Sequence, residues 1–455
     1  MMMWSPSQDG VWLNELRVGE VGGNATRMGY YGCMFSPDNQ SILGYDARGG
    51  WHGWNFDISS KTWKSAVHLQ GHFRQVTDLR WSLNGQALVT CSLDQSTRVH
   101  AAWTRQEKGQ KTVSWHEVAR PQVHGYDINC LSFVNPTTFV SGAEEKVLRV
   151  FAAPRTFVQS IASIRGVAPE RDLLDAAPIG ANTPALGLSN KAVFQDDTKN
   201  AHEAQLAFSR QSYLSTASTP TSLEEVLASP PTDEHLHQHT LWPEVDKLYG
   251  HGYELISVSA NHSGTFVVSA CKAAKPEHAG IRVWNTKDWQ EVSILRCHSL
   301  TVTCLQFSPN DQYLVSVGRD RGVALWKATG NDLDPYSLVQ YNPKAHSRII
   351  WAITWTPDAS LFITASRDKS IKIWDTLTFT CVDTIKFDDA VTALDCYVEC
   401  SKESEFLVAV GMESGSIRVL KGNHHPGSWV EITRVPESYV LFRFFDFLLF
   451  RQLFF

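Results

Sequence analysis

The sequence predicts an all-β protein, a β-propeller in which four-stranded sheets stand radially around a central axis. The first observation is a repeat, in which His346 precedes Asp368 by 22 positions and Asp368 precedes Trp374 by 6. The second is a series of short alternating runs, such as VTDLRW, VTCLQF and LFITAS, separated by turns like SPND and TPDA. Such runs are typical of half-buried strands, and their recurrence with a landmark indicates one supersecondary unit used many times.

Other copies keep the same frame. The interval of 22 recurs from His298 to Asp320 and from His72 to Asp94, and Trp326 again follows Asp320 by 6. Looser copies place Glu145 21 positions after His124, or put His278 in the aspartate position of the copy that begins at His251. Two more copies are recognised by their ends, at 48–55 and 414–420. Seven recognisable copies predict a WD40 (WD-repeat) propeller.

The landmarks have a structural explanation. In this repeat a His, a Ser or Thr, an Asp and a Trp form a buried hydrogen-bonded group, here called a clasp. A buried carboxylate is tolerable only when donors satisfy it, so the Asp depends on the imidazole, a hydroxyl and turn amides. The predicted clasp residues are His346, Ser366, Asp368, Trp374, His298, Asp320, Trp326, His72, Ser92 and Asp94.

Two of the clasps are incomplete, since Gly318 stands at the predicted hydroxyl position of one and His100 at the Trp position of another. Ser, His and Asp also form hydrolase triads, but a catalytic set should occur once, whereas this set recurs at fixed spacing. The sequence contains no GxSxG elbow, Walker A loop, HExxH or CxxC. We therefore expect no enzyme activity, no catalytic residue, no cofactor and no metal ion.

The composition excludes a positive electrostatic potential over the whole protein surface. The formal net charge is -6, so contact with nucleic acid or an anionic membrane would have to be local. Nine scattered cysteines read as reduced thiols of an intracellular protein, and the N-terminus lacks the pattern of a secretory signal.

An inserted arm interrupts the repeats. It is rich in Pro, Ser, Thr and Ala, and its strand-like segment PALGLSNKAVF (184–194) is expected to dock on a blade. Its alternating His235, His237 and His239 are more simply solvated than metal-bound. The expected divisions are 1–58, the last blade or blades of an upstream propeller; 59–153, the first two blades of a second propeller; 154–242, the partly disordered arm; 243–435, four further blades; and 436–455, an aberrant apolar tail.

The two ends of the sequence are unusual for a propeller. Residues 2–4 read as the end of a third strand, so we expect further sequence upstream. The apolar tail stands where another blade is expected, and we interpret it as the product of a misplaced exon boundary or a frameshift.

Long blocks outside the landmarks resemble the family of the second subunit of the Elongator complex. The blocks are VWLNELRVGEVGGN (11–24), WHEVARPQVHGYD (115–127), SGAEEKVLRVFAAPR (141–155), PALGLSNKAVF, TLWPEVDKLYGHGYE (240–254), SACKAAKPEHAGI (269–281), HSLTVT (298–303) and HSRIIW (346–351). The resemblance covers about residues 1–440 and implies a truncated member of the family, with the end of one seven-bladed propeller and most of a second. The arm would lie between the second and third blades of the latter.

The resemblance also implies a function. The family subunit has no chemistry of its own and would support assembly with the large scaffold and catalytic subunits of Elongator. That complex modifies wobble uridines of transfer RNA and has been linked to histone acetylation and transcription elongation. Cytoplasmic and nuclear localisation is expected, with no membrane partner.

One rim of the predicted propeller is basic. Arg319 and Arg321 flank Asp320, Arg367 and Lys369 flank Asp368, and Arg348 follows His346. Guanidinium groups suit bidentate contacts with carboxylates or phosphates, so these residues are predicted to bind a partner, either a protein subunit or a transfer RNA. The plainer interpretation is a set of rim salt bridges worth little individually.

Other classes of WD-repeat protein fit this sequence less well. A generic adaptor, such as a substrate receptor of a ubiquitin ligase, commonly shows Trp-Asp-x-Arg after the third strand, but Trp374 and Asp375 are followed by Thr376 and Leu377. A nucleic-acid-binding module is a further alternative, although the net charge is negative and no platform of aromatic and basic residues is evident.

Overall fold

A computed structural model describes the chain between residues 2 and 435. Within that span it leaves out 8, 18–29, 47–49, 69, 108, 179, 183–190, 194–225, 234, 237–239, 399–404 and 426. Strands dominate the described part and pair mostly in antiparallel sheets, which confirms the predicted all-β class. None of the helices described has both the length and the apolar character needed to cross a bilayer. The predicted apolar tail, 436–455, lies outside the described residues.

Apart from one hairpin, each sheet has four strands that pair in chain order, except that β16 is the fourth strand of the β11 sheet, which β15 and β14 extend; each sheet is called a blade and named by its first strand. The strands are β3 (Tyr30–Phe35), β4 (Ser41–Asp46), β5 (Trp51–Asp57) and β6 (Thr62–Ala66); β7 (Val76–Trp81), β8 (Ala87–Ser92), β9 (Thr97–Glu107) and β10 (Gln110–Ala119); β11 (Ile128–Asn135), β12 (Thr138–Ala143), β13 (Leu148–Ala152) and β16 (Glu244–Leu248); β17 (Leu255–Ala260), β18 (Phe266–Cys271), β19 (Ile281–Asn285) and β20 (Glu291–Leu295); β21 (Val302–Phe307), β22 (Tyr313–Gly318), β23 (Val323–Ala328) and β24 (Tyr336–Asn342); β25 (Ile350–Trp355), β26 (Leu361–Ser366), β27 (Ser370–Asp375) and β28 (Cys381–Lys386); β29 (Val391–Val398), β30 (Phe406–Met412), β31 (Ile417–Gly422) and β32 (Val430–Val435). A separate hairpin is formed by β1 (Met2–Pro6) and β2 (Trp12–Arg17).

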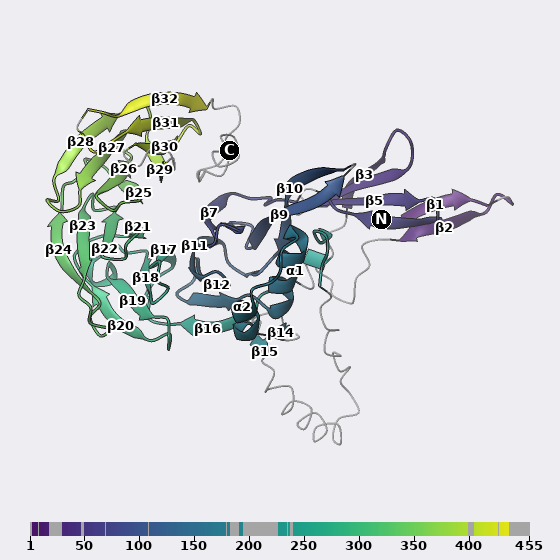
Figure 1. The fold of residues 1–455 in the computed structure, drawn as a ribbon, viewed down its shortest axis with the longest axis horizontal. Helices are drawn as coiled ribbons and strands as arrows, with labels where there is room; N and C mark the ends of the chain where they lie inside the picture. Colours follow the sequence, from purple (N-terminus) through teal and green to yellow (C-terminus); the bar gives the residue numbers. More distant parts are fainter. Residues whose placement is uncertain are drawn as a thin grey trace, which may run out of the picture.

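Six blades follow one another around an arc, from the β7 blade to the β29 blade. Their first strands pack in succession, β7 on β11, β11 on β17, and so on to β29. Figure 1 shows the arc, with its first and last blades standing apart. This radial arrangement is the one that the repeat predicted.

The inner blades of the arc are packed on both faces by their neighbours, which explains why both faces of their middle strands are buried. All six residues of β26 are buried. Successive side chains of a strand point to opposite faces. Phe362 therefore joins the cluster shared with the β21 blade, whereas Ile363 joins the cluster shared with the β29 blade.

The strand pairing corrects two predicted boundaries. The arm does not lie between two blades, because β16 pairs with β13 and supplies the fourth strand of the β11 blade. The arm is thus inserted inside that blade, between its third and fourth strands. The boundary expected at residue 58 also moves, because β6 pairs with β5 and the β3 blade continues to Ala66. Period alone could not assign either fourth strand, because this strand carries no landmark residue.

The described part of the arm packs on the propeller. It contains α1 (Arg155–Arg165), α2 (Arg171–Ala176), β14 (Gly180–Asn182) and β15 (Lys191–Val193). Val158 and Ala162, one helical turn apart, are buried, and Val158 packs in the same cluster as Phe139 and Trp242. Gly166 ends α1 in the left-handed conformation, at φ 71°. The strand β15 pairs with β14 and β16, so the predicted docking of this segment is seen for Lys191–Val193.

Candidate functional site

The clasp of the β25 blade joins four side chains from the loop before the blade, the strand β26, the turn after it and the strand β27. The His346 Nδ1 lies 3.0 Å from the Asp368 Oδ2, and the His346 Nε2 lies 2.8 Å from the Thr364 Oγ1. The Trp374 Nε1 donates to the same hydroxyl at 3.0 Å. The amide of Ser347 donates to the Asp368 Oδ2 at 2.9 Å. One hydroxyl therefore links the imidazole to the indole, and the carboxylate fixes the imidazole.

The prediction that Ser366 supplies the hydroxyl of this clasp is wrong, because Thr364 supplies it. Ser366 donates instead to the carbonyl of Ile349 at 2.9 Å and accepts the amide of Asp368 at 3.1 Å. The prediction of Ser92 is wrong in the same way, because Ser92 accepts the amide of Asp94. Both serines shape the turn that carries the Asp, and the clasp hydroxyl lies two residues earlier on the same strand. Residues two apart in a strand share a face, so spacing to the Asp alone does not separate them.

The β21 blade has a complete clasp, contrary to the prediction. The His298 Nε2 lies 2.9 Å from the Ser316 Oγ, its Nδ1 lies 2.9 Å from the Asp320 Oδ2, and the Trp326 Nε1 donates to Ser316 at 3.0 Å. Gly318 does not occupy the hydroxyl position. A Cβ added to Gly318 would come within 2.8 Å of a backbone carbonyl oxygen, so the close packing of this turn excludes a larger residue.

The β7 blade carries a clasp without the indole. The His72 Nε2 lies 2.7 Å from the Thr90 Oγ1, and the His72 Nδ1 lies 2.8 Å from the Asp94 Oδ2. Although burial alone would raise it, hydrogen bonds from His72 and Ser96 hold the pKa of Asp94 at about 2. His100 occupies the Trp position, and burial lowers its pKa to about 4.

Two further clasps are partial. The His251 Nε2 lies 2.8 Å from the Ser269 Oγ, to which the Trp284 Nε1 also donates at 2.8 Å. In the β11 blade the His124 Nε2 lies 3.1 Å from the Glu145 Oε1. In four blades the hydroxyl residue follows the His by 18 positions. This interval is present in the sequence and is the signal that identifies the clasp hydroxyl.

The complete clasps have the connectivity of a hydrolase triad, from hydroxyl to imidazole to carboxylate. Access to solvent distinguishes them from one. The hydroxyl residues Thr364 and Ser316 are both 0 % exposed, and each hydroxyl already receives an indole N–H. A nucleophile must reach a substrate carbonyl, and these hydroxyls lie between packed blades. The geometry supports a structural role for the clasps.

The buried imidazoles make stability depend on pH. Burial lowers the pKa of His100 to about 4, below the value of about 6.5 in an unfolded chain. Below pH 6.5 the unfolded chain binds the proton more readily, so stability falls as the pH is lowered from about 6.5 to about 4. We expect His100→Leu to remove roughly 3 kcal/mol of this loss. Urea unfolding at pH 7 and pH 4 measures the difference, with the exposed His425→Leu as control. If the free energy of unfolding of His100→Leu fell between pH 7 and pH 4 by as much as that of the unmodified chain, the result would contradict this role of His100.

The basic rim is an exposed run along two adjacent blades. The amide of His346 donates to the carbonyl of Arg321 at 3.4 Å, and the amide of Arg367 donates to the carbonyl of Ile349 at 2.9 Å. These backbone bonds hold both turns against the loop that carries Arg348. Its predicted members Arg319, Arg321, Arg348, Arg367 and Lys369 are all exposed.

The rim guanidinium groups have no ionic partner among the described residues. None of the four arginines lies within salt-bridge distance of a carboxylate in that part of the chain, and Lys369 donates to the carbonyl of Asp388 at 2.9 Å. Rim salt bridges, the plainer interpretation, are therefore not seen there. A partner-binding role for the rim stays a prediction.

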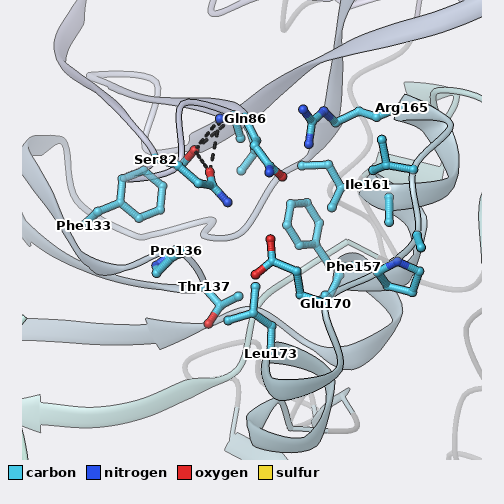
Figure 2. A pocket seen from close by; sticks show the side chains of 18 of the residues that line it. Ser82, Gln86, Phe133, Pro136, Thr137, Phe157, Ile161, Arg165, Glu170 and Leu173 are labelled. Atoms are coloured by element: carbon cyan, nitrogen blue, oxygen red, sulfur yellow. Dashed lines mark hydrogen bonds between the residues drawn. The ribbon is translucent and has the colours of Figure 1, made fainter.

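A pocket that the sequence did not reveal lies between the arm and the β7 and β11 blades. Figure 2 shows Phe157, Ile161 and Leu173 of the arm on one side of it and Phe133 on the other, with Arg165 at its margin and the Glu170 carboxylate pointing into it. Its lining, among the described residues, contains no His or Cys. The pocket offers both polar and apolar contact, with Ser82, Thr137 and Glu170 among its polar lining residues.

A buried charge network is a second feature that period did not predict. Glu117, at the end of β10, accepts from Arg98 at 3.0 Å and from Arg120 at 2.6 Å. Arg120 also donates to Asp233 of the arm at 2.5 Å. The side chains of all four residues are at most 4 % exposed. The charged residues Arg98 within β9 and Glu117 within β10 were the available signal.

Comparisons with known proteins agree with this architecture. The sequence model of the family "WD domain, G-beta repeat" matches residues 63–100, 289–327 and 338–375. The chain is 43 % identical over 447 residues to Elongator complex protein 2 of Danio rerio, covering 92 % of this chain and 54 % of that protein. The human protein of the same name is 42 % identical over 96 % of this chain and 54 % of its own length.

The chain belongs to the Elongator complex protein 2 family. The likeness extends to the fission yeast Schizosaccharomyces pombe, whose Elongator complex protein 2 is 36 % identical over 96 % of this chain. The chain spans about half the length of the curated relatives that it matches. Because the match runs through the arm and the loops as well as the WD landmarks, it identifies this family among WD-repeat proteins.

Proposed function

We propose that the chain acts as a non-catalytic scaffold that supports assembly of the Elongator complex through its large scaffold and catalytic subunits. Family membership supports this, as do clasps whose hydroxyls are closed to solvent. The observation that carries the proposal is the exposed run of four arginines without ionic partners in the described part of the chain. Guanidinium groups that no internal carboxylate neutralises are free to bind an anionic surface.

The partner surface is proposed to be acidic protein. Fixed backbone positions let the guanidinium groups meet carboxylates in a defined arrangement, which favours one protein partner. Binding of transfer RNA by the same rim is the alternative, and it would make affinity fall steeply with salt. As part of Elongator, the protein would support modification of wobble uridines in transfer RNA, with links to histone acetylation and transcription elongation, in cytoplasm and nucleus.

Charge reversal tests the proposal. Arg319→Glu, Arg321→Glu and Arg348→Glu, combined in the full-length protein, should reduce co-purification of the other Elongator subunits at least ~10-fold, because buried charge pairs cost several kcal/mol when one partner is reversed. Lys287→Glu, at an exposed turn between β19 and β20, is the matched control and should leave co-purification unchanged. Quantitative mass spectrometry of the purified complex gives the readout.

Two outcomes would contradict this function. Unchanged recovery of all subunits with the triple variant would remove the rim from assembly. Intact assembly together with lost retention on immobilised transfer RNA would assign the rim to nucleic acid instead.

A further inference from the structure

Two opposite charges line the pocket between the arm and the β7 and β11 blades. Arg165 is the last residue of α1, and Glu170 directly precedes α2. Figure 2 shows the Glu170 carboxylate pointing into the pocket. The apolar part of the lining includes Phe133, Phe157 and Leu173. The pocket therefore places a negative charge beside aromatic and aliphatic side chains.

Neither of these two charges has an ionic partner among the residues that the structure describes. Arg165 and Glu170 are only five positions apart, yet no salt bridge joins them to each other or to another side chain of that part. Both residues are open to solvent, Glu170 fully and Arg165 in part. A ligand that enters the pocket can thus reach both charges.

The backbone around the pocket holds the two charges in place. Gly166 ends α1 in the left-handed conformation, so the chain turns sharply directly after Arg165. The Arg155 Nε at the start of α1 donates to the carbonyl of Leu174 in α2 at 3.1 Å. The amide of Leu174 in turn donates to the carbonyl of Glu170 at 3.2 Å. The segment between the two helices is therefore fixed at both ends, which lowers the entropic cost of binding.

The polar groups on the blade side are largely satisfied within their own turn. The Ser82 Oγ donates to the Asn84 Oδ1 at 2.8 Å, and both oxygens accept the amide of Gln86 at 3.1 Å. The Thr137 Oγ1 donates to the Asn135 Oδ1 at 3.1 Å. The Glu170 carboxylate is thus the charged acceptor that the pocket offers to a donor from outside.

We propose that this pocket binds an arginine side chain of a partner protein, with an acidic residue of the same segment meeting Arg165. The methylenes of the arginine would lie on the apolar walls. Its planar guanidinium would form a bidentate pair with Glu170 and contact the ring of Phe157, which a lysine ammonium does less well.

Size and charge both favour this occupant. The cavity volume is about 240 Å³, below the roughly 300–1,000 Å³ of pockets that hold drug-sized ligands, so it suits one side chain. The net charge of the chain, -6, adds a general attraction for a basic segment. This inference rests on the proposed scaffold role, because it assigns the occupant to a protein partner, but it concerns a surface other than the basic rim.

Titration of the full chain with a capped dipeptide, acetyl-Arg-Asp-methylamide, tests the pocket. The readout is the isotope-labelled δ1 methyl signal of Ile161, which lines the pocket and is identified by its loss in Ile161→Val. We expect this signal to shift to saturation. Glu170→Gln should weaken the affinity about 10-fold or more, because a charged hydrogen-bonded pair closed off from water contributes more than an exposed one.

Two controls separate the charge from the apolar contact. Glu277→Gln makes the same change at a carboxylate that is 64 % exposed and pairs with Lys275, and it should leave the affinity unchanged. Acetyl-norleucine-Asp-methylamide keeps an apolar stem without the guanidinium and should bind the unmodified chain about 10-fold more weakly. Replacing Asp of the peptide by Asn should weaken binding to the unmodified chain but not to Arg165→Gln.

Three results would overturn the proposal. The first is an affinity for the arginine peptide that is unchanged in Glu170→Gln, with circular dichroism showing that the variant is folded. The second is a norleucine peptide that binds as tightly as the arginine peptide, which would make the pocket a site for apolar side chains. The third is an Ile161 signal that does not respond to the arginine peptide. Because the titration needs no other subunit, these results would leave the co-purification test of the rim unaffected.

Discussion

Replacing Glu117 with Gln should lower the free energy of unfolding by about 3–5 kcal/mol, because it leaves buried guanidinium groups without their counter-charge. Glu117 is 3 % exposed and accepts from Arg98 and Arg120, which are themselves buried. Gln keeps the shape of the side chain, removes the charge and turns one of the two acceptor oxygens into an NH2 donor. The loss should appear in urea unfolding followed by circular dichroism.

Glu277→Gln provides the comparison. Its carboxylate pairs with Lys275 at the surface, where the side chains are 64 % and 74 % exposed. Exposed ion pairs contribute about 0–1 kcal/mol, so this variant should unfold almost as the unmodified chain does. Equal effects of the two substitutions would mean that water reaches Glu117 and that the network is not buried in solution.

Removing the hydroxyl of Thr364 should cost about 3 kcal/mol, whereas removing that of Ser366 should cost about 1 kcal/mol. Thr364→Val keeps the side-chain volume but leaves the Nε2 of His346 and the Nε1 of Trp374 without a partner. Ser366→Ala removes hydrogen bonds at the end of β26, where the amide of Asp368 adjoins the exposed turn.

The same urea unfolding measures this pair, and each variant serves as the control of the other. The ratio of the two losses is the informative quantity, since both substitutions delete one hydroxyl from the same strand. A larger loss of unfolding free energy for Ser366→Ala than for Thr364→Val would indicate that Ser366 is the clasp hydroxyl, as the spacing to Asp368 suggested. It would contradict the hydrogen bonds of Thr364.

The clasps show how far the period of the repeat could predict the structure. A His and its Asp 22 positions later lie within one blade, and the contact depends on strand and turn lengths that recur in each copy. The His and Asp pairs could therefore be assigned from spacing. The hydroxyl could not be assigned from the distance to the Asp, because Thr364 and Ser366 share a face of β26.

The arm shows where period stops being informative. Asp233 lies 113 positions after Arg120, and no repeat relates the two residues. The fourth strand of the β11 blade likewise returns only after the whole arm, at Glu244–Leu248. Such pairings are set by packing between distant segments, which a single sequence does not encode as a pattern.

The sequence by itself determined the blades, because each blade is a local unit whose apolar alternation and His-to-Asp spacing fall within a few tens of residues. The tertiary structure decided which hydroxyl completes each clasp, which strand closes the β11 blade, and how Glu117, Arg120 and Asp233 come together. The physical reason is that these contacts depend on burial between segments far apart in the chain, where the need to pair each buried charge selects the partner.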